Sequence, residues 1–303
     1  MQYKLLLTFL LIGHFTFGQT DKHIKVPGTK CSLIPPGGFV ATTNFSGFQS
    51  SETGASIMIN ELPAPYQQLV DGFTAEALKT RGMTLISNQT IDFNKSKATL
   101  IKVTQPANGA VYLKQILIFG DAKGTVLVNG IYPEASKSVE GKISDALLST
   151  VYNTSQNDNP LEAAPFTLNV EGTEYKVARF IAGSLFYSTD GKMPTEKPAL
   201  IVGSSLAKVS APNQKQYAQE RLKKLPRGEF NIIKEINEIT FDGLSGYEII
   251  ADGKAADNQP ELVYQVMLFN DKGDYYIILG HAKENIESNL ETYKKIAKTF
   301  KRK

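Results

Sequence analysis

The feature that most constrains this chain is an internal repeat, because a stretch in its second half follows the pattern of a stretch in its first half. Residues 119–130 and 269–280 each read as the end of an apolar run, a polar turn with glycine, a second apolar run and a closing glycine. Each is followed by an acidic residue, Glu134 or Glu284, and by apolar residues at helical spacing. The two stretches lie about 150 residues apart, which is the length of a domain and not of a solenoid repeat. The sequence therefore predicts two sister domains.

The two halves predict the same order of elements: a hairpin or pair of strands, a strand, a helix, four further strands and a closing helix. In the first half these are expected at residues 39–51, 55–59, 65–82, 83–93, 98–104, 111–119, 125–131 and 134–152. In the second half they are expected at residues 166–170 and 177–188, 199–202, 213–225, 230–241, 246–251, 262–269, 275–279 and 284–300.

This order determines the expected fold class. Successive strands without helices between them form an antiparallel meander, and each amphipathic helix needs a sheet face for its apolar stripe. We expect an α+β protein of two tandem α/β/α sandwich domains, each an antiparallel meander sheet with one helix before it and one after it. The expected boundaries are a signal peptide at 1–18, a flexible mature N-terminus at 19–30, a first domain at 31–152, a polar linker at 153–165 and a second domain at 166–303.

The start of the first domain carries a resemblance. Residues 33–39 read Leu-Ile-Pro-Pro-Gly-Gly-Phe and precede the hairpin, helix, meander and final helix. This entry and this order resemble the PsbP family of photosystem II extrinsic proteins, whose fold is shared by the Ran-binding nuclear import factor and by periplasmic DcrB-like proteins. The second half lacks the motif and resembles the family in element order alone. The resemblance implies a PsbP-like domain in each half and a protein that binds partners.

The N-terminus predicts export. Lys4 precedes a short apolar run at residues 5–12, and Thr16-Phe17-Gly18 offers a cleavage point before Gln19. This is the layout of a secretory signal peptide, and it resembles leaders of Bacteroidetes, although a retained anchor or a buried helix would also be apolar. We expect a periplasmic or extracellular protein. No later segment is apolar enough to span a membrane, and the near-neutral charge of +3 does not favour nucleic acid as a partner.

Residues with catalytic or metal-binding chemistry are few. The chain has three histidines and one cysteine, Cys31, so a zinc site of histidines or of cysteine and histidine is not expected. His281 is the one histidine within the predicted domains, and its counterpart in the repeat is Ile131, which favours a packing role at a strand end over catalysis. Cys31 is read as an inert thiol. The aspartates of 252–257 and 271–274 are read as turn residues, not Ca²⁺ ligands. We predict no catalytic residue, no metal and no cofactor.

Three functions stay open at this point. The first is a non-enzymatic exported envelope protein that acts as a binding or assembly module for a protein partner. The second is a module that binds a small ligand or lipid, and the third is a hydrolase with a carboxylate site that no motif reveals. A filled core in each half favours the first function. A cavity of several hundred Å³ with converging polar groups favours the other two.

The predicted partner contact is a polar loop of the second half. Residues 189–198 connect two strands, and the two prolines in the loop restrict its shape. A loop that adds little to a core is a candidate for recognition, although a tolerated insertion without a role would look the same. The candidate contact residues are Asp190, Lys192, Met193 and Glu196.

Overall fold

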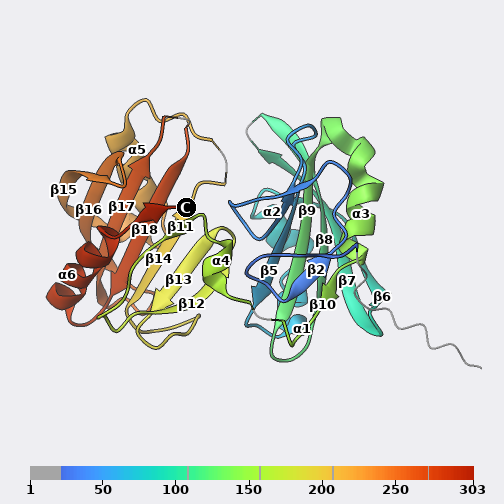
Figure 1. Ribbon diagram of the computed structural model, residues 1–303, viewed down its shortest axis with the longest axis horizontal. Helices are drawn as coiled ribbons and strands as arrows, with labels where there is room; N and C mark the ends of the chain where they lie inside the picture. The colour runs from blue at the N-terminus through green and yellow to red at the C-terminus, as the bar shows by residue number, and fades with distance from the viewer. Residues whose placement is uncertain (1–21, 108, 157, 207, 272) are drawn as a thin grey trace, which may run out of the picture.

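The computed structural model describes residues 22–303 except 108, 157, 207 and 272. Its main bodies are two antiparallel sheets of seven strands, one in each half of the chain. Figure 1 shows the sheets side by side, with the first half on the right and the second on the left. We use "first half" for residues up to 152 and "second half" for residues from 166. The fold is thus α+β with antiparallel sheets.

The two sheets have the same strand order. The first runs β3 (Val40–Ala41), β4 (Gly47–Gln49), β5 (Ser56–Leu62), β9 (Thr125–Pro133), β8 (Ala110–Gly120), β7 (Ser96–Ala107) and β6 (Thr84–Phe93). The second runs β12 (Lys176–Ile181), β13 (Ser184–Ser188), β14 (Ala199–Ser204), β18 (Tyr275–Ala282), β17 (Pro260–Phe269), β16 (Leu244–Lys254) and β15 (Ile232–Phe241).

The strand register also agrees between the sheets. The β6–β7 pair shifts register between Leu85 and Ser87, and the β15–β16 pair shifts between Ile233 and Glu235. Eight residues after each of these points, the edge strand ends in a phenylalanine, Phe93 or Phe241, followed by a two-residue turn of positive φ. Such turns match the right-handed twist of a hairpin. Positions in the halves can therefore be matched residue by residue through the pairing.

Short strands tie the ends of each half together. In the first half β1 (Ile24–Lys25) and β10 (Val151–Tyr152) both pair with β2 (Cys31–Leu33), and in the second half β11 (Phe166–Thr167) pairs with β19 (Lys301–Arg302). The hydroxyl of Ser149 accepts a hydrogen bond from the backbone N–H of Ile34 at 2.9 Å. The hydroxyl of Thr299 accepts one from Asn169 at 2.8 Å. Strand β2 therefore corresponds to β11, and β10 to β19.

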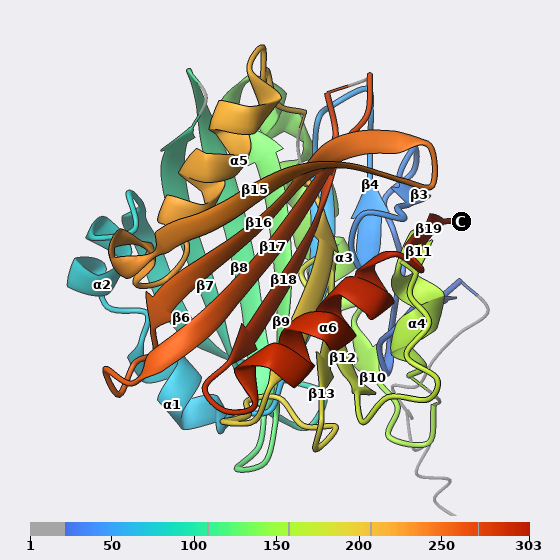
Figure 2. The same cartoon turned by 90° about the vertical axis from the view of Figure 1, so that its left-hand side faces the viewer.

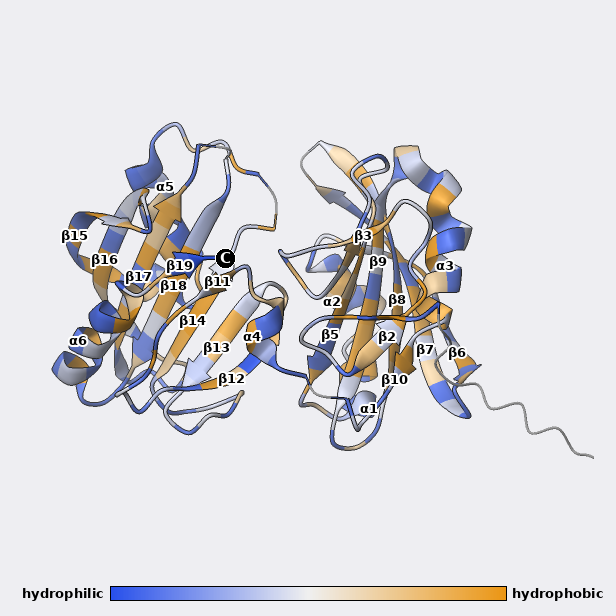
Figure 3. Ribbon diagram, in the orientation of Figure 1, coloured by the Kyte–Doolittle hydropathy of each residue, from blue (hydrophilic) through white to orange (hydrophobic). Residues whose placement is uncertain are grey.

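Helices pack on the sheets according to the alternation of strand side chains. In the second half, α6 (Ile286–Ala297) buries Tyr293 and Ile296 with the even-numbered residues of β17, and α5 (Gln214–Lys223) buries Ala218 and Leu222 with the odd-numbered ones. In the first half, α3 (Glu140–Leu148) and the short α2 (Ala75–Lys79) share β8 in the same way. Figure 2 shows α6 lying across its sheet, and Figure 3 shows hydrophobic residues along the central strands.

A glycine permits close approach of the helix in both halves. A Cβ on Gly280 would lie 2.6 Å from Cδ2 of Tyr293 in α6. A Cβ on Gly130 would collide with Ile143 in α3. These are the two closing glycines of the sequence repeat, so the repeat marks the point at which each helix rests on its sheet.

Several predicted elements differ in the structure. The helix expected at 65–82 is two short helices, α1 (Tyr66–Asp71) and α2, because Thr74 caps a new helix by accepting a hydrogen bond from the N–H of Ala77 at 3.1 Å. The helix expected at 134–152 begins as the 3₁₀ helix η1 (Glu134–Val139), continues as α3 and ends before β10, whose pairing with β2 extends the chain. A further 3₁₀ helix, η2 (Gly228–Phe230), precedes β15.

The two predicted connecting segments also have regular structure. Of the segment predicted as flexible, 19–30, the structure describes residues 22–30, which form β1 and bury Val26 completely, because an apolar side chain at this point can join the first core. The linker predicted at 153–165 contains α4 (Pro160–Ala163), with Asn159 as its cap and Ala163 and Ala164 buried. The predicted leader, 1–18, lies outside the described residues. Within the described part of the chain, no helix has the length and apolarity needed to cross a membrane.

Candidate functional site

A cavity of about 640 Å³ opens at one end of the first sheet. It lies beside the β8–β9 turn, the β6–β7 turn, the end of β5 and strand β10, and Arg179 of β12 reaches it from the second half. The lining residues are Lys30, Glu61, Leu62, Pro63, Phe93, Asn94, Ser96, Lys97, Phe119, Gly120, Asp121, Lys123, Gly124, Thr125, Val126, Val151, Tyr152, Thr154, Asp158 and Arg179. Its volume is in the range of small-molecule sites.

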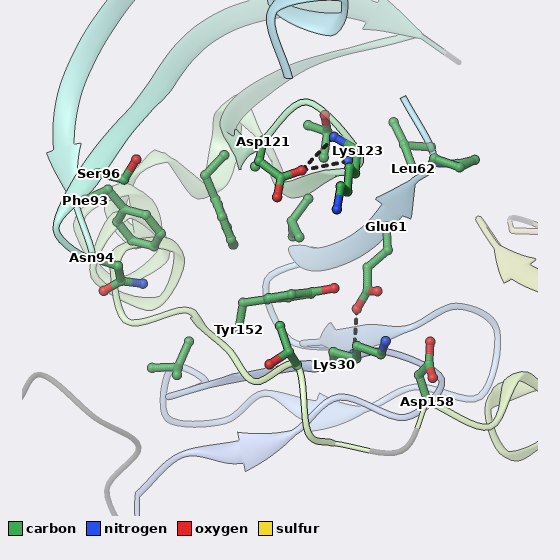
Figure 4. A pocket seen from close by; sticks show the side chains of 18 of the residues that line it. Lys30, Glu61, Leu62, Phe93, Asn94, Ser96, Asp121, Lys123, Tyr152 and Asp158 are labelled. Atoms are coloured by element: carbon green, nitrogen blue, oxygen red, sulfur yellow. Dashed lines mark hydrogen bonds between the residues drawn. The ribbon is translucent and has the colours of Figure 1, made fainter. Parts of the chain in front are cut away.

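One side of the cavity is apolar and the other is charged. The rings of Phe93 and Phe119 lie against each other with centroids 4.9 Å apart, and Val126 adds an aliphatic surface. Figure 4 shows Glu61, Lys30 and Asp158 gathered on the opposite side, with Tyr152 between the two sides. A ligand that fills the cavity would therefore meet the apolar group on one side and Glu61, Lys30 and Asp158 on the other, with Lys97, Asp121 and Lys123 also in the lining.

Small residues of the first half stand at three positions where the second half has aromatic ones, and one of them, Val126, lines the cavity. Val126 lies four residues before Gly130, as Tyr276 does before Gly280. Three matched positions differ in this way: Cys31 against Phe166, Val126 against Tyr276, and Thr150 against Phe300.

In the second half these rings fill the same end of the core. The ring centroids of Tyr276 and Phe300 are 5.0 Å apart, and those of Phe166 and Phe300 are 6.1 Å apart. Arg302, the counterpart of Tyr152, donates from Nε to the carboxylate of Asp242 at 2.7 Å and so closes the edge of the cluster. The aromatic end of the second core and the cavity end of the first core thus have matching strand arrangements and differ in the size of their side chains. We call them the filled end and the hollow end.

Glu61 is a half-buried acidic group of the first half. Its Oε1 accepts a hydrogen bond from the backbone N–H of Lys30, and the Sγ of Cys31 lies 3.9 Å from the same oxygen. Burial, followed by the repulsion of Asp158, raises the pKa of this carboxyl, and the Lys30 hydrogen bond opposes the increase. Burial and the neighbouring Glu61 likewise raise the pKa of the Cys31 thiol. Cys31 is fully buried, so the structure agrees with an unreactive thiol.

Arg179 brings the second half to the site. Its Nη1 donates to the backbone oxygen of Glu61 at 2.9 Å, and the N–H of Ala182 donates to the side-chain oxygen of Asn60 at 3.0 Å. The register shift between Val177 and Arg179 in the β12–β13 pair is a β-bulge, a feature that re-aims side chains. The wall of the cavity is therefore built from both halves.

Two further polar residues of the lining have structural explanations. Asp121 accepts hydrogen bonds from the N–H groups of Lys123 at 2.7 Å and Gly124 at 3.1 Å, and these bonds lower the pKa of its carboxyl. Lys97 forms an ion pair with Asp92 at 2.6 Å. Burial, with the nearby Glu61, raises the pKa of the Tyr152 hydroxyl to about 12, so Tyr152 is a neutral hydrogen-bond donor at physiological pH.

The residues singled out from the sequence lie elsewhere. The candidate contacts Asp190, Lys192 and Glu196 are exposed and Met193 is half-buried, all in the 189–198 loop of the second half. The Nζ of Lys283 connects this loop to the 257 turn through Glu196 at 2.9 Å and Asp257 at 3.0 Å. His281 lies at the end of β18 with 33% of its side chain exposed, and its Nδ1 lies 3.7 Å from Glu261.

Sequence reasoning missed the cavity, although one signal for it was present. Aligning the two repeat stretches places Val126 opposite Tyr276, and a large ring opposite a small side chain at matched positions indicates that the two cores are filled differently. Glu61, Asp158 and Arg179 carried no signal, because their proximity arises from the contact between the halves. Within the described ranges, no group of three or more histidine, cysteine, aspartate or glutamate side chains is arranged to hold a metal ion.

The site and fold define a two-sheet α+β protein with one hollow and one filled core end. No protein-family model matches the chain, and no curated protein matches it. Among solved structures, LpqN, involved in cell envelope biogenesis of Mycobacterium tuberculosis, is 15% identical over 45% of this chain and 81% of its own, with a TM-score of 0.34. Cyanobacterial PsbP from Synechocystis is 11% identical over 41% and 87%, with a TM-score of 0.32.

One further similarity runs along most of the chain. The immunity protein TplEi of the type VI secretion system from Pseudomonas aeruginosa is 12% identical over 93% of this chain and 98% of its own, with a TM-score of 0.32. At these identities and TM-scores, none of the solved structures assigns a family or a function to the chain.

Proposed function

We propose that this chain is an exported, non-enzymatic binding protein whose first half holds a small amphiphilic ligand. The observation that carries the proposal is the cavity of about 640 Å³ at the matched position where the second half is filled by Phe166, Tyr276 and Phe300. A cavity with apolar side chains at one end and a few converging polar groups at the other is the usual form of a small-molecule site. Export is part of the proposal through the leader pattern of residues 1–18.

We further infer that each half is a PsbP-like α/β/α sandwich domain and that the two arose by tandem duplication, with residues 153–165 as their connection. The shared strand order, the shared register shift and the matched glycines support this inference. A non-enzymatic role is part of the proposal because the Cys31 thiol, 3.9 Å from the Glu61 carboxylate, is fully buried, and burial raises its pKa and so disfavours the reactive thiolate. The cavity favours ligand binding over a purely protein-binding role.

The test fills the cavity by copying the second half. N-phenyl-1-naphthylamine, an apolar dye that fluoresces in dry surroundings, is titrated into the full chain and into Val126→Tyr. We expect the unaltered chain to bind the dye and Val126→Tyr to lose at least about tenfold in affinity, because the added ring occupies apolar space. Val128→Ile is the matched control, since Val128 lies in the same strand and core but does not line the cavity. Absence of dye binding by the unaltered chain, or equal binding by Val126→Tyr, would contradict the proposal.

Binding of a protein partner is the second candidate function, and the internal hydrogen bonds of the 189–198 loop favour it. The Ser188 hydroxyl donates to the backbone oxygen of Lys192 at 2.8 Å, and Thr195 donates to Asp190 at 3.1 Å. A loop fixed in this way loses little entropy on binding. Removing residues 190–197 and comparing the proteins captured from envelope extract tests this candidate. An unchanged set of captured proteins, with unfolding unaltered, would exclude the loop.

A further inference from the structure

Four charged side chains converge at the polar side of the cavity, and we call them the charge cluster: Lys30, Glu61, Asp158 and Arg179. All four are half-buried. They come from four separate places in the chain, namely the segment before β2, the end of β5, the connection before α4, and β12. Two are acidic and two are basic, so the charge cluster has no net charge.

These groups act on one another electrostatically. The charges of Asp158, Lys30 and Arg179 all influence the ionisation of Glu61, the first opposing its charge and the other two favouring it. No direct ion pair within 4 Å joins any two of the four in the described part of the chain. Arg179 uses one of its five N–H groups on the backbone of Glu61, and Glu61 uses one oxygen on the backbone of Lys30. Charged donors and acceptors of both signs are thus still available to a ligand.

An ion of a single sign would fit this arrangement poorly. A carboxylate placed here is attracted by Lys30 and Arg179 but repelled by Glu61 and Asp158, and an ammonium meets the reverse. Because the groups are half-buried, solvent screens these interactions less than it does at an open surface. A head group that carries both charges gains from both pairs. The apolar tail would then lie against Phe93, Phe119 and Val126.

Resting on the function proposed above, we propose that the natural ligand is a zwitterionic amphiphile with an ammonium and an anionic oxygen group close together, held between the two halves of the chain. The ammonium faces Glu61 and Asp158, and the anionic group faces Lys30 and Arg179. The second half then contributes directly to the site of the first through Arg179.

The test compares three probes that share an eight-carbon chain: octanoate, octylamine and 2-aminooctanoate. Each is titrated against the full chain loaded with N-phenyl-1-naphthylamine, and displacement of the dye is measured at pH 7. We expect 2-aminooctanoate to displace the dye at a concentration at least about tenfold lower than either singly charged probe, since it alone can form charge-assisted hydrogen bonds with both the acidic and the basic pair. A singly charged probe that displaces the dye as well as 2-aminooctanoate does would overturn the proposal.

Substitutions in the charge cluster test whether it causes the preference for 2-aminooctanoate over the singly charged probes. Glu61→Gln keeps an oxygen for the Lys30 N–H, and both Glu61→Gln and Arg179→Gln are expected to reduce the preference to about threefold or less. Lys234→Gln is the matched control, because Lys234 also carries a positive charge, pairs with Asp252 and does not line the cavity. Retention of the full preference in both cluster variants would contradict the assignment. Dye binding without a zwitterion preference refutes this inference alone, whereas no dye binding by the unaltered chain refutes the proposed function itself.

Discussion

The filled end of the second half and the hollow end of the first half have the same strand arrangement but different side chains. In the second half, Phe166, Tyr276 and Phe300 pack together and Arg302 closes the edge. In the first half, Cys31, Val126 and Thr150 stand at the matched positions, and a cavity with charged and apolar sides remains. The comparison teaches that the same strand order can enclose an aromatic cluster or border a cavity, and Val126 is the matched position at which this difference meets the cavity. The filled half also serves as an internal reference for the hollow one.

The largest expected effect is the loss of stability on removing an aromatic side chain from the filled end of the second half. Phe300 is 1% exposed, and Phe300→Ala should lower the free energy of unfolding by about 3–5 kcal/mol, the usual cost of emptying a buried aromatic site. Thr150→Ala at the matched position should cost about 1 kcal/mol or less, because the Thr150 hydroxyl is buried without a hydrogen-bond partner. Urea unfolding of both variants measures this. Similar losses would mean that the two ends are filled alike.

An effect of intermediate size is expected at Gly130 and Gly280, the glycines at which the helix approaches the sheet in each half. Gly280→Ala and Gly130→Ala each place a Cβ against the helix above, against Tyr293 or Ile143. Each should lower the free energy of unfolding by about 1–3 kcal/mol through overpacking. The control is Gly141→Ala in α3, where nothing lies within 4 Å of the new Cβ. There we expect a gain of up to about 1 kcal/mol, because alanine favours the helix. If only one of the two strand glycines is sensitive, the helices do not rest on their sheets in the same way.

The smallest effect concerns the pH dependence of the hollow end. Burial raises the pKa of Glu61 in the folded chain above its unfolded value of about 4.5. The folded state therefore binds this proton more tightly, so the stabilising contribution of protonated Glu61 is complete below pH 4.5 and is lost as pH rises through the folded pKa. Glu61→Gln should match the unaltered chain in stability at pH 4 and exceed it at pH 7. Thermal unfolding at both values checks this, and an unchanged difference between them would show that Glu61 is solvated.

The strands could be predicted from the sequence because their patterning is local. Alternating apolar residues and the glycine turns within residues 119–130 and 269–280 locate the meanders of both halves to within a few residues. The split of the helix at 65–82 was not predicted, since the Thr74 cap competes with an apolar stripe that reads as continuous. The end of the helix before β10 was missed for a different reason: pairing with β2 involves residues more than a hundred positions away.

The site was less accessible to sequence reasoning than the fold. The contrast between Val126 and Tyr276 could be read from the repeat, but the charge cluster could not. Glu61 and Arg179 are 118 positions apart and meet through a side-chain-to-backbone hydrogen bond. Such a contact leaves no spacing pattern in the sequence. Pattern reasoning instead favoured the 189–198 loop, which is polar and local, and its role in binding stays a prediction.

The burial of Ala163 and Ala164 has a consequence for dissecting the chain. These residues belong to the connection between the halves, yet both pack in the core of the second half with Phe166 and Phe180. A fragment that starts at residue 166 would lack this apolar cover, whereas one that starts at Asn159 would keep α4 together with its cap. The same α4 also meets the first half, since Gly28 abuts Ala163 with no room for a side chain. A fragment that starts at residue 159 therefore exposes to water the apolar surface of α4 that Gly28 covers in the full chain.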